Sequence, residues 1–395
     1  MKKITICIPS KSNLRYLKMA IPSIRKNEAN PDNQIIVYVD EDNDGTVEWM
    51  DKNAEQYGVK VIVNPFLGKK LTGIGKAYDK CVEASETEVF MIGHCDMYYC
   101  KNFDKNGLEH LQKGTVVALT RIEPPLHPNN GEKILKDFGM YPEDLEEEKL
   151  SEYVEQHLQD DKITNGIFAP WIMYKSDHQA IGGHDVRMHS CREDSDIFNR
   201  MSLAGYKFVQ PWNAFVYHMA GRGAGSFGNA DTEEDRIRHE KWKKNMNNST
   251  REFIRKWGSN VKHSALMEPI IAPIYDIGIR VSNGNLQLLA MLEPWCNDIY
   301  IDCDSYPYIE EEQYNTSDIL PAKIHPLEVL GNNDVILKID GKAFTQHDYQ
   351  MVMEMGSILK QSGRVGKSKL GQFNIFVEIT KFVEKQNELI VCKSE

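Results

Sequence analysis

The segment Gln34-Ile-Ile-Val-Tyr-Val-Asp40-Glu-Asp42-Asn-Asp44-Gly-Thr46 is a nearly continuous apolar run that ends in a group of carboxylates. An apolar run without alternation is typical of a strand buried on both faces. Similar runs occur at residues 4–9, 60–64 and 88–93, and a helical stretch at 75–84 precedes the last of them. Strands that alternate with helices predict a parallel sheet covered on both sides, with ligands at the carboxyl ends of its strands.

The composition is that of an acidic globular protein. The 395 residues include 47 Lys and Arg against 58 Asp and Glu, which gives a net charge of −11. We therefore do not expect nucleic acid as a partner, because phosphate contact needs a basic surface. The sequence contains no run of 18 apolar residues, so we expect no transmembrane helix. The opening residues do not resemble a signal peptide. We expect a cytoplasmic protein with reduced thiols, and leave peripheral membrane association open.

The pattern changes twice along the chain. From Arg121 to about Thr164 a proline-rich loop leads into an acidic helical stretch, which fits either a solvated helix face or an acceptor-side insertion at 121–165. A charged helix or helix pair follows at 231–257. Beyond residue 265 strands alternate with helices again, at 275–281, 298–302, 334–340 and 373–379. We predict a first domain at residues 1–260 and a second, smaller α/β domain at 265–395.

Acidic residues follow three of the strand-like runs. They lie at Asp40–Asp44, at His94-Cys-Asp96 and at Glu193-Asp194, and His218 comes about one strand after the last pair. Carboxylate and imidazole ligands suit Mn²⁺ or Mg²⁺ better than a metal that prefers thiolates. An ion held by Asp96 and His218 could neutralise a diphosphate, leaving Asp194 as a base. Each carboxylate alone is also explained by a turn or a helix cap.

The order of these motifs resembles the family 2 glycosyltransferases of the GT-A fold, over roughly residues 3–257. Two motifs resemble that family's donor side: Ile6-Cys-Ile-Pro9 its opening strand and proline turn, and Val39-Asp40 to Thr46 its nucleotide-binding motif. The others resemble its metal and acceptor motifs: Gly93-His94-Cys95-Asp96 the D-x-D, Ile181-Gly-Gly-His-Asp185 with Glu193-Asp194 the GG-x-D and ED motifs, and His218 with Gly221–Gly228 the metal-ligand histidine and glycine loop.

The resemblance implies an α/β nucleotide-diphospho-sugar transferase fold, a Rossmann-like mixed sheet flanked by helices, and an inverting sugar transfer. The donor would be a nucleoside diphosphate sugar, UDP-sugar by default, and the acceptor hydroxyl is unidentified. Asp194 would be the catalytic base, and Mn²⁺ or Mg²⁺ would be held by Asp96, His218 and His94. The remaining implied contacts are Pro9, Asp40, Asp42, Lys76 and Asp96 for the nucleotide sugar, and Gly182, Gly183, Asp185 and Glu193 for the acceptor side.

The sequence departs from the family pattern at two places. His94 replaces the first aspartate of D-x-D, where it could ligate the metal or hydrogen-bond a phosphate. The family often has an arginine in the preceding helix, but the matching position in this sequence falls near Tyr78 and Asp79. Lys69, Lys70 or Lys76 would then have to supply the positive charge that faces the phosphates. Because His94 stands in place of a metal-binding aspartate, the alternative of a catalytically inactive protein that binds a nucleotide sugar stays open. A sugar nucleotidyltransferase is disfavoured, because Pro9-Ser-Lys-Ser-Asn13 lacks the glycine-rich basic loop that a triphosphate needs.

The second domain vaguely resembles a class I methyltransferase, from Ile274 through Gly284 to Ile301-Asp302. Its glycine-rich cofactor turn lacks the usual G-x-G, since Gly278 and Gly284 lie too far apart. We therefore expect degenerate binding or an oligomer interface in this domain rather than methyl transfer.

Overall fold

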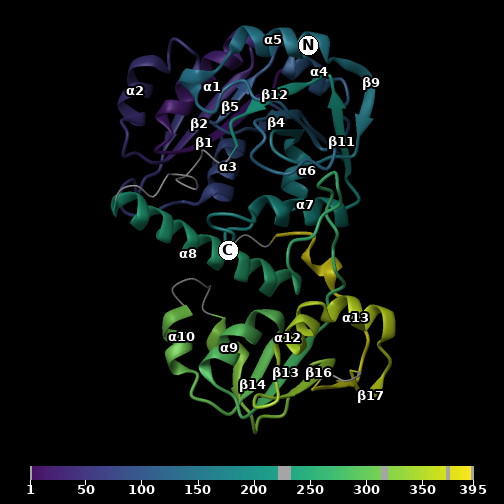
Figure 1. The fold of residues 1–395 in the computed structure, drawn as a ribbon. Coiled ribbons are helices and arrows are strands. Elements are labelled where there is room, and N and C mark those ends of the chain that lie inside the picture. The colour runs from purple at the N-terminus through teal and green to yellow at the C-terminus, as the bar shows by residue number, and fades with distance from the viewer. Residues whose placement is uncertain (1, 221–232, 313–318, 371–373, 393–395) are drawn as a thin grey trace. The chain divides into compact units, whose positions relative to one another are not determined.

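The computed structural model describes residues 2–220, 233–312, 319–370 and 374–392 (Figure 1). The glycine loop predicted at Gly221–Gly228 therefore lies outside the described residues. The chain forms two compact units. Unit 1 comprises residues 1–245, 263–269 and 391–395, and unit 2 comprises residues 246–262 and 270–390. The long helix α8 (Glu233–Trp257) is shared by the two units.

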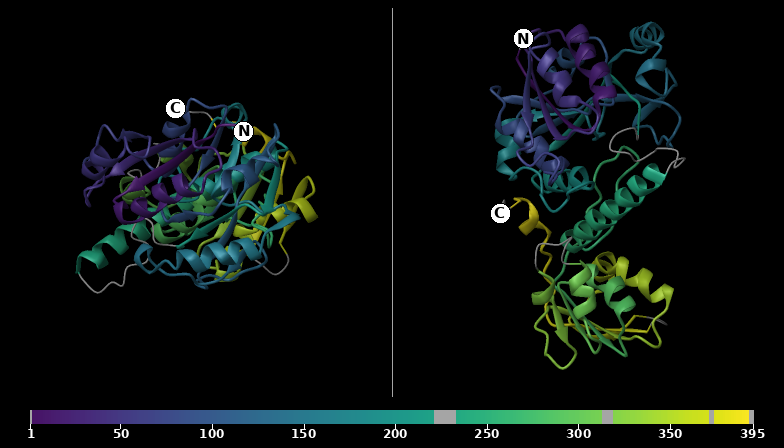
Figure 2. Two further views of the ribbon diagram at one scale, coloured as in Figure 1. Left: turned by 90° about the horizontal axis from the view of Figure 1, so that it is seen from above. Right: turned by 90° about the vertical axis from the view of Figure 1, so that its left-hand side faces the viewer.

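Unit 1 is built on a mixed eight-stranded sheet (Figures 1 and 2). In spatial order its strands are β3 (Val59–Val63), β2 (Gln34–Glu41), β1 (Thr5–Lys11), β4 (Val89–Ile92), β10 (Trp171–Tyr174), β6 (Thr115–Ala118), β11 (Lys207–Trp212) and β9 (Gln159–Thr164). The first four are parallel, and they are the four strands that the buried apolar runs predicted. β10 runs antiparallel to both of its neighbours. The mixed α/β fold that the sequence predicted is thus confirmed.

The helices of unit 1 lie between these strands in the sequence. They are α1 (Leu14–Asn27), α2 (Thr46–Asn53), α3 (Ile74–Glu83), α4 (Phe103–Leu108), η1 (Pro142–Asp144), α5 (Glu147–Gln156), α6 (Lys175–Ala180), α7 (Glu193–Leu203) and the first part of α8. In α1, Leu17, Ile21 and Ile24 are fully buried, as their helical spacing indicates. Pro22 lies inside α1 without ending it, and the buried residues on both sides of Pro22 hold the helix against the sheet despite one missing hydrogen bond.

A second, four-stranded sheet in unit 1 joins segments that are far apart in the sequence. Its strands, in spatial order, are β5 (Met97–Tyr99), β12 (Phe215–His218), β7 (Thr120–Glu123) and β8 (Lys133–Leu135). β12 pairs antiparallel with β5, so that His218 lies opposite Met97. It pairs parallel with β7, so that Tyr217 lies opposite Ile122. The proline-rich loop that the sequence predicted lies between β7 and β8, two short strands that the sequence did not predict.

Unit 2 contains a six-stranded sheet. Its strands, in spatial order, are β15 (Ile324–Pro326), β14 (Asp298–Ile301), β13 (Ile277–Ser282), β16 (Val335–Asp340), β18 (Ile375–Ile379) and β17 (Gly366–Lys369). The first four are parallel, and β18 and β17 are antiparallel to their neighbours. Its helices are α9 (Leu286–Leu292), η2 (Glu293–Trp295), α10 (Tyr306–Glu312), α11 (Leu320–Lys323), α12 (Gln346–Met353), α13 (Met355–Ser362) and η4 (Gln386–Leu389). This is the additional C-terminal α/β domain that the sequence predicted.

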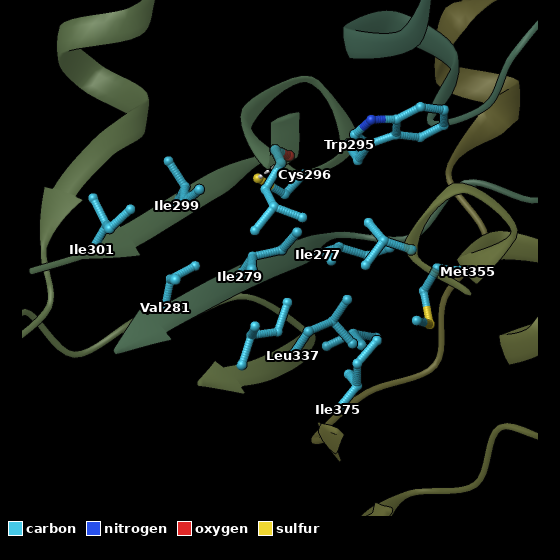
Figure 3. Packing of buried hydrophobic residues seen from close by; sticks show 14 of the residues in the cluster. Ile277, Ile279, Val281, Trp295, Cys296, Ile299, Ile301, Leu337, Met355 and Ile375 are labelled. Atoms are coloured by element: carbon cyan, nitrogen blue, oxygen red, sulfur yellow. Dashed lines mark hydrogen bonds between the residues drawn. The ribbon is translucent and has the colours of Figure 1, made fainter. Parts of the chain in front are cut away.

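Alternate residues of these strands form one continuous hydrophobic core (Figure 3). Ile277, Ile279 and Val281 of β13 contribute to it, as the two-residue period of a strand requires. The turn after β13 corresponds to the segment that we compared with a cofactor-binding turn. Two of its backbone amides form hydrogen bonds within the protein. The backbone N–H groups of Asn283 and Gly284 donate to the Asp302 carboxylate, at 2.7 and 2.6 Å.

A buried carboxylate fixes the last part of α8 within unit 2. Glu293 has no exposed surface and accepts hydrogen bonds from Arg255 Nη2 and Lys323 Nζ, both at 2.6 Å. It also accepts from Tyr308 Oη at 2.7 Å. Burial alone would raise the pKa of Glu293, but the charges of Lys323 and Arg255 bring it well below its usual range. Burial of this ionised group is thus compensated by two cations and a hydroxyl.

We expect Glu293→Ala to destabilise the protein by about 3–5 kcal/mol, because it leaves the buried Arg255 and Lys323 charges without this acceptor. Urea unfolding followed by circular dichroism measures the loss. The matched control is Glu328→Ala, which removes an exposed carboxylate and should change the stability by less than about 0.5 kcal/mol. Equal effects of the two substitutions would contradict the role given to Glu293.

Candidate active site

The carboxyl ends of β1 and β2 hold the residues predicted to bind a nucleotide. Pro9 lies in β1, opposite Tyr38 of β2. The Asp40 carboxylate at the end of β2 accepts from Asn64 Nδ2 at 2.9 Å and from the backbone N–H groups of Thr72 at 2.7 Å and Gly73 at 3.1 Å. It therefore orders the loop that leads into α3. Each carboxylate oxygen has two lone pairs, so Asp40 can also accept a hydrogen bond from a ligand.

Two further predicted residues of this edge have different surroundings. Asp42 accepts from the backbone N–H groups of Thr46 and Val47, at 2.7 and 3.1 Å. N–H groups in the first turn of a helix have no acceptor within the helix, so Asp42 acts as a cap for α2. Lys76 is exposed on α3.

Two further residues, which the sequence did not single out for the donor side, lie near the predicted nucleotide-binding residues. His189 lies against Gly73, where a Cβ would be 2.5 Å from the imidazole Nδ1. Burial lowers the pKa of His189, and the charges of Asp40, Lys11 and Lys70 also act on it. At the end of β1 the buried Ser10 Oγ has no hydrogen-bond partner among the described residues. A buried hydroxyl without a partner at this edge of the sheet could form a hydrogen bond with a bound nucleotide.

The predicted metal ligands His94, Asp96 and His218 come together at the end of β4 and beside the second sheet. His218 Nε2 lies 3.6 Å from Asp96 Oδ1, and His94 Nδ1 lies 3.9 Å from the same oxygen. One donor atom from each residue lies within 4.8 Å of the others. The two distances to Asp96 exceed hydrogen-bond lengths and are a few tenths of an ångström longer than the separation of about 3.0–3.5 Å between ligand atoms about 2.1 Å from a shared ion. The three side chains could therefore hold a divalent ion after a small inward shift.

His218 is held from its other side by a carboxylate that the sequence did not reveal. Its Nδ1 donates to Glu123 Oε1 at 2.9 Å, which leaves Nε2 directed at Asp96. Glu123 is itself paired with Arg121 at 2.5 Å and Lys133 at 2.9 Å, and all of these side chains are buried. A carboxylate that orients a metal-binding histidine in this way is a common partner of metal sites.

The charges of this group shift its pKa values. Burial raises the pKa of Asp96, but the neighbouring His218 and His94 outweigh that effect and bring it to about 2. Burial lowers the pKa of His218, but the charges of Asp96 and Glu123 raise it to about 9. Burial lowers the pKa of His94 to about 4. A metal ion binding here would therefore meet an ionised Asp96 and a neutral His94, and would release a proton from His218.

The predicted acceptor-side glycines form a tight turn after α6. Gly182 and Gly183 have φ angles of +78° and +69°, which side chains rarely adopt. A Cβ on Gly183 would lie 2.8 Å from an oxygen of the Asp79 carboxylate, so the turn also needs glycine for space. Arg200 on α7 has no exposed surface and donates to the backbone oxygens of Ile181 at 2.6 Å and Gly183 at 2.5 Å. The turn is thus fixed from two sides.

Asp79 stands near the position where the family resemblance led us to look for an arginine. It accepts from His184 twice, through the backbone N–H at 2.9 Å and the ring Nδ1 at 2.6 Å, and His178 Nε2 lies 3.2 Å away. The His184 ring stacks on Tyr78, with centroids 5.6 Å apart, and Tyr78 stacks on His94 at 6.5 Å. Asp79 therefore ties α3 to the glycine turn instead of supplying a positive charge.

Glu193 and Asp194 begin α7 but have different environments. Glu193 is buried, and its Oε2 has no hydrogen-bond partner among the described residues. Burial and the charge of Asp194 raise the pKa of Glu193 to about 8, so that it is protonated at neutral pH. Asp194 accepts from the Ser195 backbone N–H, and its charge acts on the pKa of His94. Asp185, the other predicted acceptor-side carboxylate, pairs with Arg187 at 2.7 Å.

The raised pKa of Glu193 predicts a pH-dependent cost to stability. Above pH 4.5 the unfolded state loses its proton while the folded state keeps it until about pH 8, so stability falls by up to about 1.4 kcal/mol per pH unit in that window. We therefore expect Glu193→Gln to be more stable than the wild type at pH 8 and equally stable near pH 4, as measured by urea unfolding. Glu148→Gln, an exposed carboxylate in the first turn of α5, should show no such trend. Parallel stability curves for the wild type and Glu193→Gln would mean that Glu193 is ionised in the folded protein.

Residues 5–182 match the model of Glycosyl transferase family 2. No curated protein is similar enough to the sequence to count as a match. Among solved structures, S. aureus TarS is 14% identical with a TM-score of 0.40, over 64% of this chain and 43% of TarS. TarS 1–349 from S. aureus in complex with UDP is 13% identical with a TM-score of 0.40, over 64% of this chain and 80% of that one.

A crystal structure of GalNAc-T7 with UDP, GalNAc and Mn²⁺ is 11% identical with a TM-score of 0.43, over 65% of this chain and 51% of that one. The family match covers β1 to the glycine turn at Gly182, which includes the ends of β1, β2 and β4 and the Asp96 motif. Residues 5–182 are therefore similar to family 2 glycosyl transferases, and they form the greater part of the mixed α/β sheet of unit 1.

Proposed function

We propose that unit 1 catalyses a metal-dependent, inverting transfer of a sugar from a nucleoside diphosphate sugar to an acceptor hydroxyl. The observation that carries the proposal is the convergence of a base candidate and a metal-ligand group at one edge of the sheet. Asp194 follows Glu193 at the start of α7, and the Glu193 side chain lies against Gly75 of α3, the helix whose Tyr78 ring stacks on His94. His94 in turn lies beside Asp96 and His218.

The residues divide into a donor side and an acceptor side. The donor side comprises the ends of β1 and β2, where Asp40 can accept a hydrogen bond from a base such as uracil. UDP-sugar is the default donor, and an acceptor at Asp40 is compatible with the N3–H of uracil. The acceptor side comprises the glycine turn with Asp185, Glu193 and Asp194.

Asp194 would take the proton from the acceptor hydroxyl as its oxygen attacks the anomeric carbon. A single displacement needs no protein nucleophile, so the buried cysteines near the site, such as Cys95, have no required role. Asp96, His218 and His94 would hold a divalent ion, which when bound supplies positive charge to the leaving diphosphate. Glu123 would keep His218 in the orientation that this requires.

The segment between β7 and β9 would help to select the acceptor. Its helix α5 buries Leu150 and Val154 and exposes most of its acidic residues. We keep the acceptor unspecified, as a glycan, lipid, protein or small molecule. No helix among the described residues is both long and apolar enough to cross a membrane.

The proposal is tested first by ligand-induced stabilisation. We expect UDP with Mn²⁺ to raise the melting temperature of the wild type more than GDP, CDP or TDP does, since a ligand at a hundred times its Kd adds about 2.7 kcal/mol. Asp96→Ala should lose the part of the shift that depends on Mn²⁺. If no nucleotide shifts the melting temperature under any condition, the donor site is not functional.

The second test separates an enzyme from an inactive binding protein. We expect Asp194→Asn to lower the hydrolysis of a bound UDP-sugar by about 10²–10⁴-fold, the usual contribution of a general base, while the thermal shift with UDP is retained. Asp51→Asn, which changes an exposed carboxylate on α2, is the matched control and should hydrolyse the donor at the wild-type rate. Equal rates in the Asp194→Asn variant and the wild type would remove Asp194 from the mechanism. UDP binding without any hydrolysis or transfer would favour the inactive alternative.

A further inference from the structure

We infer that one face of the unit 2 sheet binds the surface of a membrane that contains anionic lipids. The inference concerns the part of the sheet formed by β16, β18 and β17, and it does not depend on the reaction proposed for unit 1. Binding to such a surface needs positive charge that meets the headgroups and apolar side chains that can enter the layer between headgroups and acyl chains. This face carries both.

The α-helices of unit 2 pack on the opposite face of the sheet. α9, α10, α11, α12, α13 and the last part of α8 each contribute at least one side chain to the hydrophobic core that contains Leu337 and Ile375 (Figure 3). Because side chains alternate along a strand, Lys338 and Phe376 point away from this core. Both are exposed, Phe376 by 54%. Antiparallel strands often leave one face in water, where polar residues are expected, so the exposed ring of Phe376 is unusual there.

The strand register surrounds this ring with cations. Phe376 of β18 lies between Lys338 of β16 and Lys369 of β17, each directly opposite it. Lys338 in turn lies opposite Arg280 of β13. Lys367, two residues before Lys369, points to the same side. Lys369 Nζ lies 5.5 Å from the centre of the Phe376 ring. The ring therefore has an ammonium group on either side.

The face is locally basic on an acidic chain. Glu378 is the carboxylate among the lysines, and it lies 2.8 Å from Lys338 and 3.4 Å from Lys367. Lys369 has no ion-pair partner among the residues that the structure describes. Asp340, at the end of β16, is a second carboxylate on this side and accepts from Asn283 Nδ2 at 2.8 Å. Cations therefore outnumber carboxylates here, although the whole chain carries a net charge of −11.

The loop at 327–333 brings a second exposed apolar side chain to this side of the sheet. The backbone oxygens of Leu327 and Val329 accept hydrogen bonds from the guanidinium of Arg280, so the loop covers the end of the face that begins at β13. Leu330 in this loop is 86% exposed, and the loop also exposes the carboxylate of Glu328. An exposed leucine and an exposed phenylalanine thus accompany the cations, which is the composition of surfaces that enter the headgroup layer.

The chemistry of this face favours a lipid surface over other occupants. A second copy of the chain would place lysines against lysines in a self-complementary interface, where like charges repel. Single-stranded nucleic acid binds through several stacked aromatic rings, and a charged glycan is recognised best by the planar fork of arginine. The uncovered strands offer one exposed ring and flexible ammonium groups. Such point charges need no fixed geometry, which suits mobile headgroups.

The test is sedimentation of the full chain with vesicles. We expect the protein to sediment with vesicles of equal parts phosphatidylglycerol and phosphatidylcholine, and to stay in solution with phosphatidylcholine alone. Salt at about 1 M should release it, because the range of charge interactions falls from about 10 Å at about 0.1 M to about 3 Å. Each lysine near an anionic surface strengthens binding about fivefold, so Lys367→Gln combined with Lys369→Gln should weaken it about 25-fold.

Matched variants separate this surface from a general charge effect. Lys52→Gln combined with Lys360→Gln removes two exposed lysines, on α2 and α13, and should bind as the wild type does. Glu378→Gln should strengthen binding about fivefold, because it removes the carboxylate among the lysines. Leu330→Ser combined with Phe376→Ser leaves the charge unchanged and should weaken binding at least about tenfold. Circular dichroism checks that each variant is folded.

Several results would overturn the inference. They are an absence of sedimentation with the anionic vesicles, equal sedimentation with phosphatidylcholine alone, and wild-type binding by the Lys367→Gln, Lys369→Gln variant. Heparin and single-stranded DNA, measured by fluorescence anisotropy, provide two further arms. Tighter binding of either than of the vesicles, lost in the same variant, would assign the face to a glycan or to nucleic acid instead. A lipid-free dimer that is lost in the Leu330→Ser, Phe376→Ser variant would assign it to a second copy of the chain.

These measurements use neither a donor nor an acceptor sugar. Vesicle binding by a chain that transfers no sugar would leave the inference standing and remove the proposed reaction. Sugar transfer by a chain that binds no anionic vesicles would do the reverse.

Discussion

The register of β12 is the constraint on which the site depends. Its pairing with β5 places His218 beside Asp96, and its pairing with β7 places the same histidine beside Glu123. Because side chains alternate along a strand, a slip of one residue would turn His218 to the opposite face. Neither neighbour is close to His218 in the sequence. The metal-ligand group therefore exists only once three distant segments have formed one small sheet.

Unit 1 pairs the charges that it buries next to this sheet, but it leaves one buried carboxyl oxygen without a hydrogen-bond partner among the described residues. Glu123 pairs with His218, Arg121 and Lys133, which offsets the desolvation of four ionisable groups. Such networks add geometric specificity more reliably than stability. Glu193 is the exception, since its buried Oε2 has no partner among the described residues and its pKa is raised. A buried carboxyl left in this state beside the proposed base is typical of functional sites, where stability is lost for chemistry.

The sequence predicted the features that depend on local patterns. The four parallel strands coincide with apolar runs of the sequence, although β3 is only partly buried, and the acidic motifs that follow these runs indicated the candidate residues at this edge of the sheet. Glu123 could not be predicted, because β7 and β8 are short strands whose role comes from non-local pairing with β12. The cap at Asp42 and the bond from Asp79 to His184 were also not resolved, because a carboxylate looks the same in a sequence whether it binds a ligand or its own backbone.

The two departures from the family pattern, His94 and the helix around Asp79, are neighbours in space. Asp79 fixes His184, the ring of His184 stacks on Tyr78, and the ring of Tyr78 stacks on His94. An aspartate at position 94 would offer no ring to the buried Tyr78, and an arginine at position 79 would repel the two histidines that now surround the carboxylate when they are protonated. The imidazole at position 94 thus acts both as a metal-ligand candidate and as the end of an aromatic stack that begins at the glycine turn. That stack gives the acceptor side and the metal group a continuous packed contact within unit 1.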